Sequence, residues 1–163
     1  MKLIDRFCSE HGLVRPTVTI EPGRWVVGEA GITLYEVCSV KTNAAGRTYI
    51  GVDGGFPDNP RPELYDAKYE VEAVEKHGEP YDQLVTVAGK CCESGDILLK
   101  DAMMPEIKVG DTLAVLATGA YNYSMASNYN RIPRAAVVAV SDGKAKVVVK
   151  RESYEDLIKN DVL

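Results

Sequence analysis

The run Cys92–Asp96, with the sequence CESGD, places a thiol and two carboxylates directly after an apolar stretch. A thiol beside a carboxylate in such a turn can donate a proton, because nearby negative charge keeps the thiol in its neutral form. The structural alternative is a buried strand end followed by a Ser-Gly-Asp turn. The doubled cysteine, Cys91 next to Cys92, leaves two candidates for the donor, and we choose Cys92 because it directly precedes Glu93.

A second segment with chemical potential is the loop between Val52 and Pro62, which carries Arg61. Three prolines and two glycines in this loop indicate a rigid, structured connection. Prolines on both sides of Arg61 are expected to hold its backbone extended and to aim its guanidinium. Such an arginine can clamp a carboxylate through two hydrogen bonds, with Tyr65 one helical turn further along. The alternative is a solvated surface arginine.

Two further segments are unusual for a simple scaffold. Glu21-Pro22-Gly23-Arg24 ends an apolar stretch, and its glycine would let an anion such as a phosphate approach free backbone amides. A plain tight turn explains the tetrapeptide equally well. Residues 117–130 contain three tyrosines and three asparagines and little charge. Tyrosines suit packing on and hydrogen bonding to an aromatic cofactor, although a polar loop of a β domain would have the same composition.

The elements that position these segments are mostly short strands. We expect a helix over residues 2–11, where four apolar side chains share one face and Gly12 ends the pattern. We expect strands over 14–20 and near 25–29, 32–41, 46–53, 69–75, 83–91, 96–99, 112–118, 135–140 and 145–150. Asp142-Gly143 predicts a hairpin turn, Lys108–Asp111 another turn, and Ser153 the N-cap of a last helix.

This pattern predicts a mainly β fold, a barrel or sandwich, with a C-terminal helix. The opening helix and strand do not belong to it. They resemble the last unit of an alternating α/β barrel. We therefore place a domain boundary close to Arg24, with residues 1–24 as the remnant of an α/β barrel and residues 25–163 as a β domain.

Composition excludes several classes of function. The net charge of -5 and pI near 5.1 argue against a nucleic-acid-binding surface. No apolar run approaches the length of a membrane span, and residues 1–6 lack the apolar core of a signal peptide, so we expect a cytoplasmic protein. The four cysteines form no C-x-x-C pair and the two histidines are isolated, so we expect neither a metal site nor a disulfide framework.

Taken in order and spacing, the four segments resemble the diaminopimelate decarboxylases. The CESGD run at Cys92–Asp96 is the most specific motif, since the related ornithine and arginine decarboxylases keep a cysteine there but replace the residues that follow. The resemblance implies a carboxy-lyase of the lysine pathway that converts meso-2,6-diaminopimelate to L-lysine. It also implies an α/β barrel that holds pyridoxal 5'-phosphate, followed by a β domain, in dimers whose sites lie at the subunit interface.

The resemblance assigns roles to individual residues. The residues expected beside the cofactor are Glu21, Pro22, Gly23, Arg24 and Tyr121. Arg24 and Arg61 are expected to bind substrate carboxylates with the help of Tyr65, and Tyr121 to contact both cofactor and substrate. Glu93 would hold the distal amino group, and Cys92 would donate the proton into the site of the partner subunit.

Two parts of the family's site, the Schiff-base lysine and the glycine-rich phosphate loop, belong to the early part of the barrel and have no counterpart here. We therefore expect this chain alone neither to bind the cofactor covalently nor to decarboxylate, and to act as a homodimer or with a lysine-bearing barrel partner. One alternative is an inert β module that acts by association. Another, ranked lower, is an unrelated ligand-binding β-barrel.

Overall fold

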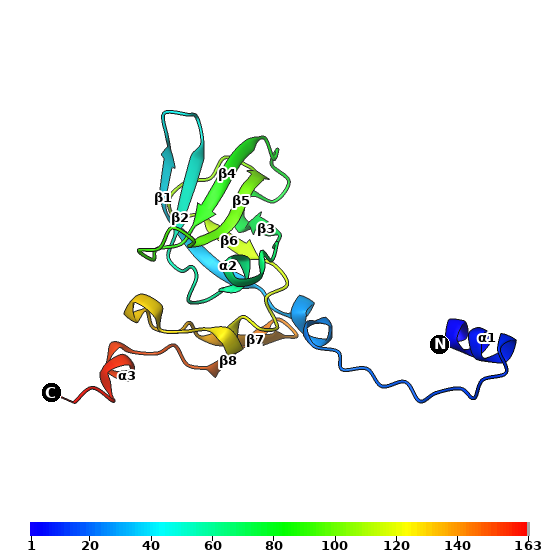
Figure 1. Ribbon diagram of the computed structural model, residues 1–163. Helices are drawn as coiled ribbons and strands as arrows, with labels where there is room; N and C mark the ends of the chain where they lie inside the picture. The colour runs from blue at the N-terminus through cyan, green and yellow to red at the C-terminus, as the bar shows by residue number, and fades with distance from the viewer. Residues whose placement is uncertain (163) are drawn as a thin grey trace.

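The computed structural model describes residues 1–162, and its centre is a six-stranded, nearly closed sheet (Figure 1). The strands are β1 (Thr33–Thr42), β2 (Thr48–Val52), β3 (Val71–Ala73), β4 (Gln83–Ala88), β5 (Ile97–Met104) and β6 (Thr112–Val115). Their order in the sheet is β3-β6-β1-β2-β4-β5, and all neighbours are antiparallel except β2 and β4. The two outer strands, β3 and β5, contact each other, so the sheet curls into a barrel. The expectation of a mainly β fold is confirmed.

The interior of this barrel is filled by alternate residues of the strands, as the period of two in a strand requires. In β2, for example, Thr48, Ile50 and Val52 are buried, whereas the residues between them are partly exposed. Met104 and Leu113 are completely buried at the same core. Because one face of each strand is packed in this way, the register of the barrel is fixed, and so are the places where its loops emerge.

Residues 25–29 do not form the expected strand. The chain instead makes two single-turn 3₁₀ helices, η1 (Arg24–Val26) and η2 (Gly28–Ala30). The reason is close packing against the segment after β6. The backbone amide of Gly119 donates to the carbonyl oxygen of Gly28 (2.8 Å), and a Cβ atom at Gly119 would collide with the carbonyl of Val27. The segment after Arg24 therefore makes its backbone hydrogen bonds with a loop, and it forms no strand.

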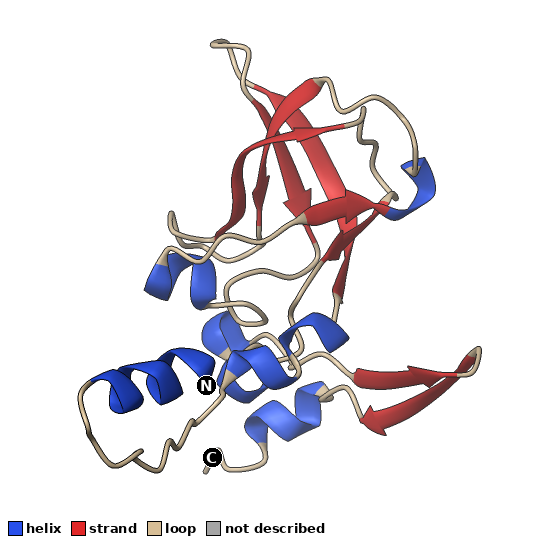
Figure 2. Ribbon diagram, turned by 90° about the vertical axis from the view of Figure 1, so that its right-hand side faces the viewer, coloured by secondary structure: helices blue, strands red, loops and turns tan. Residues whose placement is uncertain are grey.

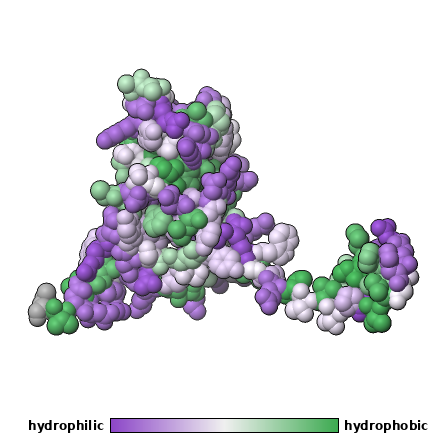
Figure 3. Space-filling view, viewed as in Figure 1, coloured by the Kyte–Doolittle hydropathy of each residue, from purple (hydrophilic) through white to green (hydrophobic). Residues whose placement is uncertain are grey.

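The N-terminal helix α1 (Lys2–Glu10) is confirmed, but the strand expected over 14–20 is wrong. That segment is extended and exposed, and within residues 1–162 it has no partner strand to complete a ladder. Figure 1 shows α1 at the end of this extended segment, far from the barrel. Figure 3 shows apolar side chains gathered on α1. On this helix Leu3 is 72% exposed and Phe7 is 52% exposed.

The C-terminal part forms a separate hairpin, β7 (Val137–Ser141) and β8 (Lys144–Val149), followed by α3 (Tyr154–Ile158). Figure 2 shows both below the barrel, beside the short loop helices. Asp142 and Gly143 have φ angles of 51° and 71°, which suit the two-residue hairpin turn expected there. Ser153 accepts a hydrogen bond from the amide of Asp156 (3.2 Å), so its predicted N-cap role is confirmed.

The remaining expectations differ from the structure mainly at their ends. Strand β5 runs on to Met104, well beyond the expected residue 99. Strand β3 stops at Ala73 and is followed by η3 (Val74–Lys76), and β6 stops at Val115. The turn at 108–111 is confirmed, with Gly110 at φ 92°. Among residues 1–162, no helix is both long and apolar enough to cross a bilayer.

Candidate active site

Arg61 begins a single helical turn, α2 (Arg61–Tyr65), which ends with Asp66 at φ 50°. The expected extended backbone at Arg61 is therefore wrong. Pro62 lies in the first helical turn, where its missing N–H has no intrahelical acceptor to lose. The helical turn brings Tyr65 back over Arg61, whose guanidinium carbon is 5.2 Å from the centre of the Tyr65 ring and 5.6 Å from that of Tyr121. The cation is thus held between two aromatic rings.

Gly23, from the N-terminal part of the chain, lies against Tyr121 of the same group. A Cβ atom at position 23 would collide with the hydroxyl of Tyr121, so only glycine allows this approach. Tyr121 itself has φ 64°, a left-handed conformation that is unusual for a bulky side chain and that aims its ring toward this point. Gly23, Arg61, Tyr65 and Tyr121 are called the arginine cluster below.

One atom of the arginine cluster is buried without a partner. The Nε of Arg61 is inaccessible to solvent and makes no hydrogen bond within the described residues. Buried polar groups in folded proteins nearly always have a partner. The chain itself thus leaves one donor of Arg61 without an acceptor.

Arg24 lies next to the arginine cluster but is already in use. Its Nη2 donates to the carbonyl oxygen of Ala117 (2.7 Å), and its guanidinium carbon is 5.8 Å from the ring of Tyr69. The hydroxyl of Tyr69 in turn donates to Oδ1 of buried Asn122 (3.5 Å). These contacts hold the segment that carries Tyr121. Glu21 and Pro22, by contrast, lie in the exposed extended segment.

Cys92–Asp96, called the cysteine turn below, forms a second group. The backbone amide of Cys92 donates to Oδ1 of Asn130 (3.1 Å), and the side chain of Cys92 is exposed. The carboxylate of Glu93 accepts from the amide of Gly95 (3.3 Å) and from the hydroxyl of Tyr129 (3.3 Å). These hydrogen bonds, the Gly95 amide first, lower the pKa of Glu93. The turn thus presents an ionised carboxylate at the surface beside an exposed thiol.

The two adjacent cysteines have different surroundings. Cys91 is partly buried, and burial, followed by the negative charge of Asp96, raises the pKa of its thiol to about 11. Cys92 points into solvent. Strand β4 ends at Ala88, short of the expected residue 91, and both cysteines lie in the bend that follows it.

Asp96 fastens the cysteine turn to the body of the protein. Its side chain is only 3% exposed, and its Oδ1 and Oδ2 accept from the amides of Phe56 (2.6 Å) and Cys91 (2.8 Å). Gly55 and Gly89 leave the space that this carboxylate occupies, because a Cβ atom at either position would overlap it. The last acid of the CESGD run is therefore a structural link between two loops.

The arginine cluster and the cysteine turn are neighbours across α2. A Cβ atom at Gly95 would collide with the carboxylate of Glu63, the third residue of α2. No hydrogen bond joins the two groups in the part of the chain that the structure describes. The chain therefore brings together Gly23, Arg61, Tyr65 and Tyr121, and it places Cys92 and Glu93 in a second group on the other side of α2.

Sequence reasoning missed three residues that shape the cysteine turn, namely Asp96, Tyr129 and Asn130. The tyrosine- and asparagine-rich segment drew attention as a whole, but its composition did not show which side chain would reach Glu93. That contact spans 36 residues of sequence and depends on tertiary packing. For Asp96, the signal that was available is the pair of glycines at positions 55 and 89.

Comparison with known proteins identifies the family. Residues 17–119 match the model described as "Pyridoxal-dependent decarboxylase, C-terminal sheet domain". The chain belongs to this decarboxylase family. Its match covers the β-barrel, the arginine of α2 and the whole cysteine turn.

The relatives of this decarboxylase chain reported below share one name, diaminopimelate decarboxylase. It is 58% identical over 162 residues to the diaminopimelate decarboxylase of Bacillus subtilis (strain 168) and 49% identical to that of Halalkalibacterium halodurans, and each alignment covers 99% of the chain. A crystal structure of the diaminopimelate decarboxylase from M. jannaschii in co-complex with L-lysine superimposes with a TM-score of 0.87 at 33% identity, covering 99% of the chain and 37% of that structure. The chain spans 37% of the length of the two curated relatives.

Proposed function

We propose that this chain is the C-terminal part of a diaminopimelate decarboxylase, which converts meso-2,6-diaminopimelate to L-lysine at the last step of lysine biosynthesis in the cytoplasm. One observation carries the proposal. Arg61 is held between the rings of Tyr65 and Tyr121 with its buried Nε unpaired, beside a turn that exposes an ionised Glu93. The two groups match a substrate that carries both carboxylates and ammonium groups.

The charges of the chain give each group a distinct task. Arg61 binds a substrate carboxylate, because its guanidinium offers paired donors and the flanking rings restrict its motion. Arg24 contributes the donors that its hydrogen bond to Ala117 leaves free. Glu93 binds the distal ammonium group. A monocarboxylate would leave some of these groups unpaired, at a cost of about 1–3 kcal/mol each.

The residues present fit pyridoxal 5'-phosphate, the cofactor of the family. Gly23 lies against the Tyr121 hydroxyl at the beginning of η1, and the first amides of a helical turn have no intrahelical partner. Glu21, Pro22, Gly23, Arg24 and Tyr121 would therefore hold one edge of it. When bound, this cofactor supplies the electron sink that lets the substrate's α-carbon lose carbon dioxide.

Cys92 holds the proton that the product needs. Its Sγ lies on the exposed side of the cysteine turn and within a segment that Asp96 and Asn130 fix in place. From there it returns a proton to the carbon that has lost its carboxylate, in the site of a partner subunit. This step needs a neutral thiol as donor.

This chain supplies only half of the proposed site. The exposed apolar face of α1 and the unpaired extended segment support residues 1–24 as the end of an α/β barrel, and residues 25–163 as the β domain that follows it. We propose that the lysine that holds the cofactor comes from a barrel partner or the preceding barrel, in a homodimeric assembly.

The test is reconstitution. The chain is mixed or fused with a lysine-bearing barrel piece of a diaminopimelate decarboxylase, and lysine formation and cofactor absorbance are followed with pyridoxal phosphate and meso-diaminopimelate. We expect product only from the combination, and strongly reduced product with Arg61→Lys, which keeps the charge and loses the planar fork. Turnover by the chain alone would overturn the half-site proposal, and no turnover by any combination would overturn the assigned reaction.

The second candidate, an inert β module that acts by association, is favoured only by the same apolar face of α1. It predicts that the chain binds the barrel piece without lysine formation. Size-exclusion chromatography of the mixture, run alongside the lysine assay, separates the two functions.

A further inference from the structure

Two side chains from residues 127–131 make hydrogen bonds to the cysteine turn. The Tyr129 hydroxyl donates to Oε2 of Glu93 (3.3 Å), and Oδ1 of Asn130 accepts from the amide of Cys92 (3.1 Å). The two contacts fall on adjacent residues of the turn. Those are the residues whose exposed side chains would act on a substrate.

The segment that provides these contacts is itself firmly shaped. Asn130 and Arg131 both have left-handed backbones, with φ angles of 55° and 56°. The Tyr129 ring packs edge-on against Phe56, with ring centres 5.7 Å apart, and the amide of Ser127 donates to the carbonyl oxygen of Pro57 (3.0 Å). Residues 127–131 therefore rest on the same loop that Asp96 ties to the cysteine turn.

A partly exposed ion pair anchors the segment from the C-terminal side. The Nδ2 of Asn128 donates to Oε2 of Glu152 (2.6 Å), and Arg134 binds Glu152 through its Nη2 (2.7 Å), its Nε and its backbone amide. Left-handed backbone conformations of non-glycine residues cost conformational free energy, and they are concentrated at functional sites. In this segment the left-handed residues Asn130 and Arg131, together with the Asn128–Glu152 hydrogen bond, fix the positions of Tyr129 and Asn130.

We propose that Tyr129 and Asn130 are positioning residues that hold the backbone of Cys92 and the carboxylate of Glu93 in the orientation in which the turn meets its substrate. This inference rests on the proposed function for the identity of the substrate group, an ammonium bound by Glu93. Oε1 of Glu93 accepts from the Gly95 amide and the Ser94 hydroxyl, and Oε2 accepts from Tyr129, which leaves a lone pair of Oε2 for that ammonium.

The first test reads the contact itself and does not depend on any reaction. In the 163-residue chain, the carboxyl carbon of Glu93 is titrated by NMR in the parent and in Tyr129→Phe, which keeps the ring against Phe56 and removes only the hydroxyl. The groups that act on Glu93 are the amides of Ser94 and Gly95 and the hydroxyls of Ser94 and Tyr129, and the carboxylate of Glu63 lies against Gly95 of the same turn. We expect the pKa of Glu93 to rise, because a hydrogen bond to its ionised form is lost.

The matched control is Tyr154→Phe, which removes a hydroxyl from a tyrosine that is 75% exposed. It should leave the Glu93 titration unchanged. An identical Glu93 titration in the parent and in Tyr129→Phe would overturn the proposal.

The second test reads the role in the reconstituted enzyme. Tyr129→Phe should raise KM for diaminopimelate roughly three- to tenfold with little change in kcat, the signature of a lost ground-state contact. Asn130→Gly, which keeps the left-handed backbone and removes the acceptor, should lower kcat, because Cys92 loses its fixed backbone. A merely structural role would change the melting temperature and leave both constants of the remaining folded enzyme unaltered, which would overturn the proposal. If the parent combination makes no lysine, the reaction assignment fails, and the NMR titration alone decides whether Tyr129 holds Glu93.

Discussion

Cys91 and Cys92 are neighbours in sequence, yet the fold gives them different chemical properties. Cys91 is tucked toward Asp96, whereas Cys92 is exposed and its amide is held by Asn130. The distinction matters because the CESGD motif alone leaves either thiol as the candidate proton donor. Accessibility supports the choice of Cys92.

This difference can be measured by thiol labelling. With a pKa of about 11, Cys91 carries almost no thiolate at pH 8, and the thiolate is the form that reacts. We expect Cys91→Ser to leave the fast-reacting thiols unchanged in number and Cys92→Ser to remove one, as counted with a chromogenic disulfide reagent. Full labelling in urea provides the control. Equal rates for the two cysteines in the folded chain would contradict the prediction.

At the scale of elements, Asp96 joins loops that carry the two halves of the site. Its carboxylate satisfies the amides of Phe56 and Cys91 at a position that is almost fully buried. Removing it leaves both donors without an acceptor. The loop before α2 and the cysteine turn would then lose their fixed relation, although neither is part of the barrel core.

Asp96→Ala should therefore lower the free energy of unfolding by about 2–4 kcal/mol, since two buried donors become unpaired. Asp96→Asn keeps one carbonyl oxygen and should cost less. Urea unfolding followed by circular dichroism measures both. Asp82→Ala, at an exposed aspartate, is the matched control and should change stability little. Similar losses for Asp96→Ala and Asp82→Ala would show that the link is unimportant.

Glu152 joins the C-terminal segment to Arg134 and, through Asn128, to residues 127–131, and these contacts are sensitive to pH. Hydrogen bonds from Arg134, its backbone amide first, and from Asn128 lower the pKa of Glu152 from 4.5 to about 2. A depressed carboxyl pKa stabilises the folded state above the unfolded-state pKa, and this contribution is lost as the pH falls toward the folded-state value. The relevant window is therefore pH 4.5 to 2.

Glu152→Gln should consequently destabilise the chain most near neutral pH. The difference in melting temperature between Glu152→Gln and the parent should narrow steadily as the pH is lowered through about 4.5 toward 3. Differential scanning calorimetry at several pH values gives this difference. Glu155→Gln, at an exposed first-turn position of α3, serves for comparison. A gap that stays constant down to pH 3 would argue against the Glu152 contact.

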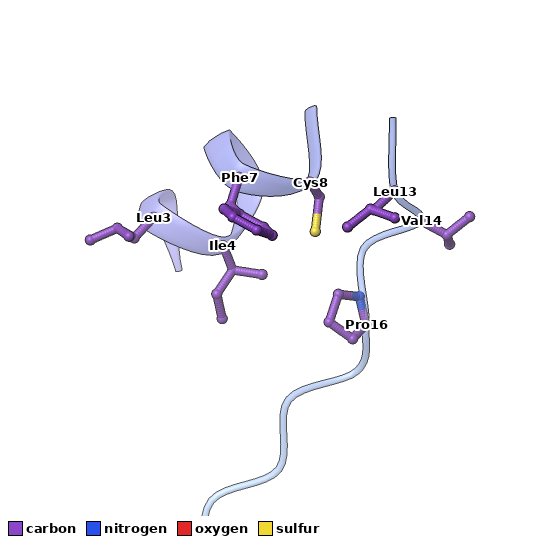
Figure 4. A pocket seen from close by; sticks show the side chains of 7 residues that line it. All are labelled: Leu3, Ile4, Phe7, Cys8, Leu13, Val14 and Pro16. Atoms are coloured by element: carbon purple, nitrogen blue, oxygen red, sulfur yellow. The ribbon is translucent and has the colours of Figure 1, made fainter. Parts of the chain in front are cut away.

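For the whole molecule, the main feature is an apolar surface that the chain does not cover. The residues that line it come from α1 and the segment after it. Figure 4 shows Ile4, Phe7, Cys8, Leu13 and Pro16 around one hollow, with Leu3 and Val14 at its two ends pointing away from it. Exposed apolar surfaces of this kind mark interaction sites. It lies at the far end of the extended segment (Figure 1), and it is the surface on which we propose that the barrel packs.

Phe7→Asp tests this arrangement. Phe7 is half exposed and stacks on His11, with ring centres 4.2 Å apart, at the far end of the extended segment. The substitution should therefore hardly change the melting temperature of the β domain. It should abolish lysine formation in the reconstituted enzyme, because a charge would be buried against the barrel piece. Lys2→Asp, on the exposed part of the same helix, should permit reconstitution. Normal activity of Phe7→Asp would contradict this placement of residues 1–24.

The sequence by itself determined what depends on neighbours in the chain. The alternation of β2, the Asp142-Gly143 turn and the Ser153 cap each involve residues a few positions apart, and all three are present in the structure. The four unusual segments were also recognisable from composition, and the family followed from their order.

Only the tertiary structure decided how those segments meet. Backbone pairing of residues 28–31 with residues 118–119 brings Gly23 and Tyr121 together, and Arg61 lies over the rings of both Tyr65 and Tyr121. Local sequence patterns cannot predict that Gly23 or Arg61 lies close to Tyr121, because these residues are far apart in sequence. The missing strand at 14–20 has the same explanation, since a strand exists only where another chain segment completes its hydrogen bonds.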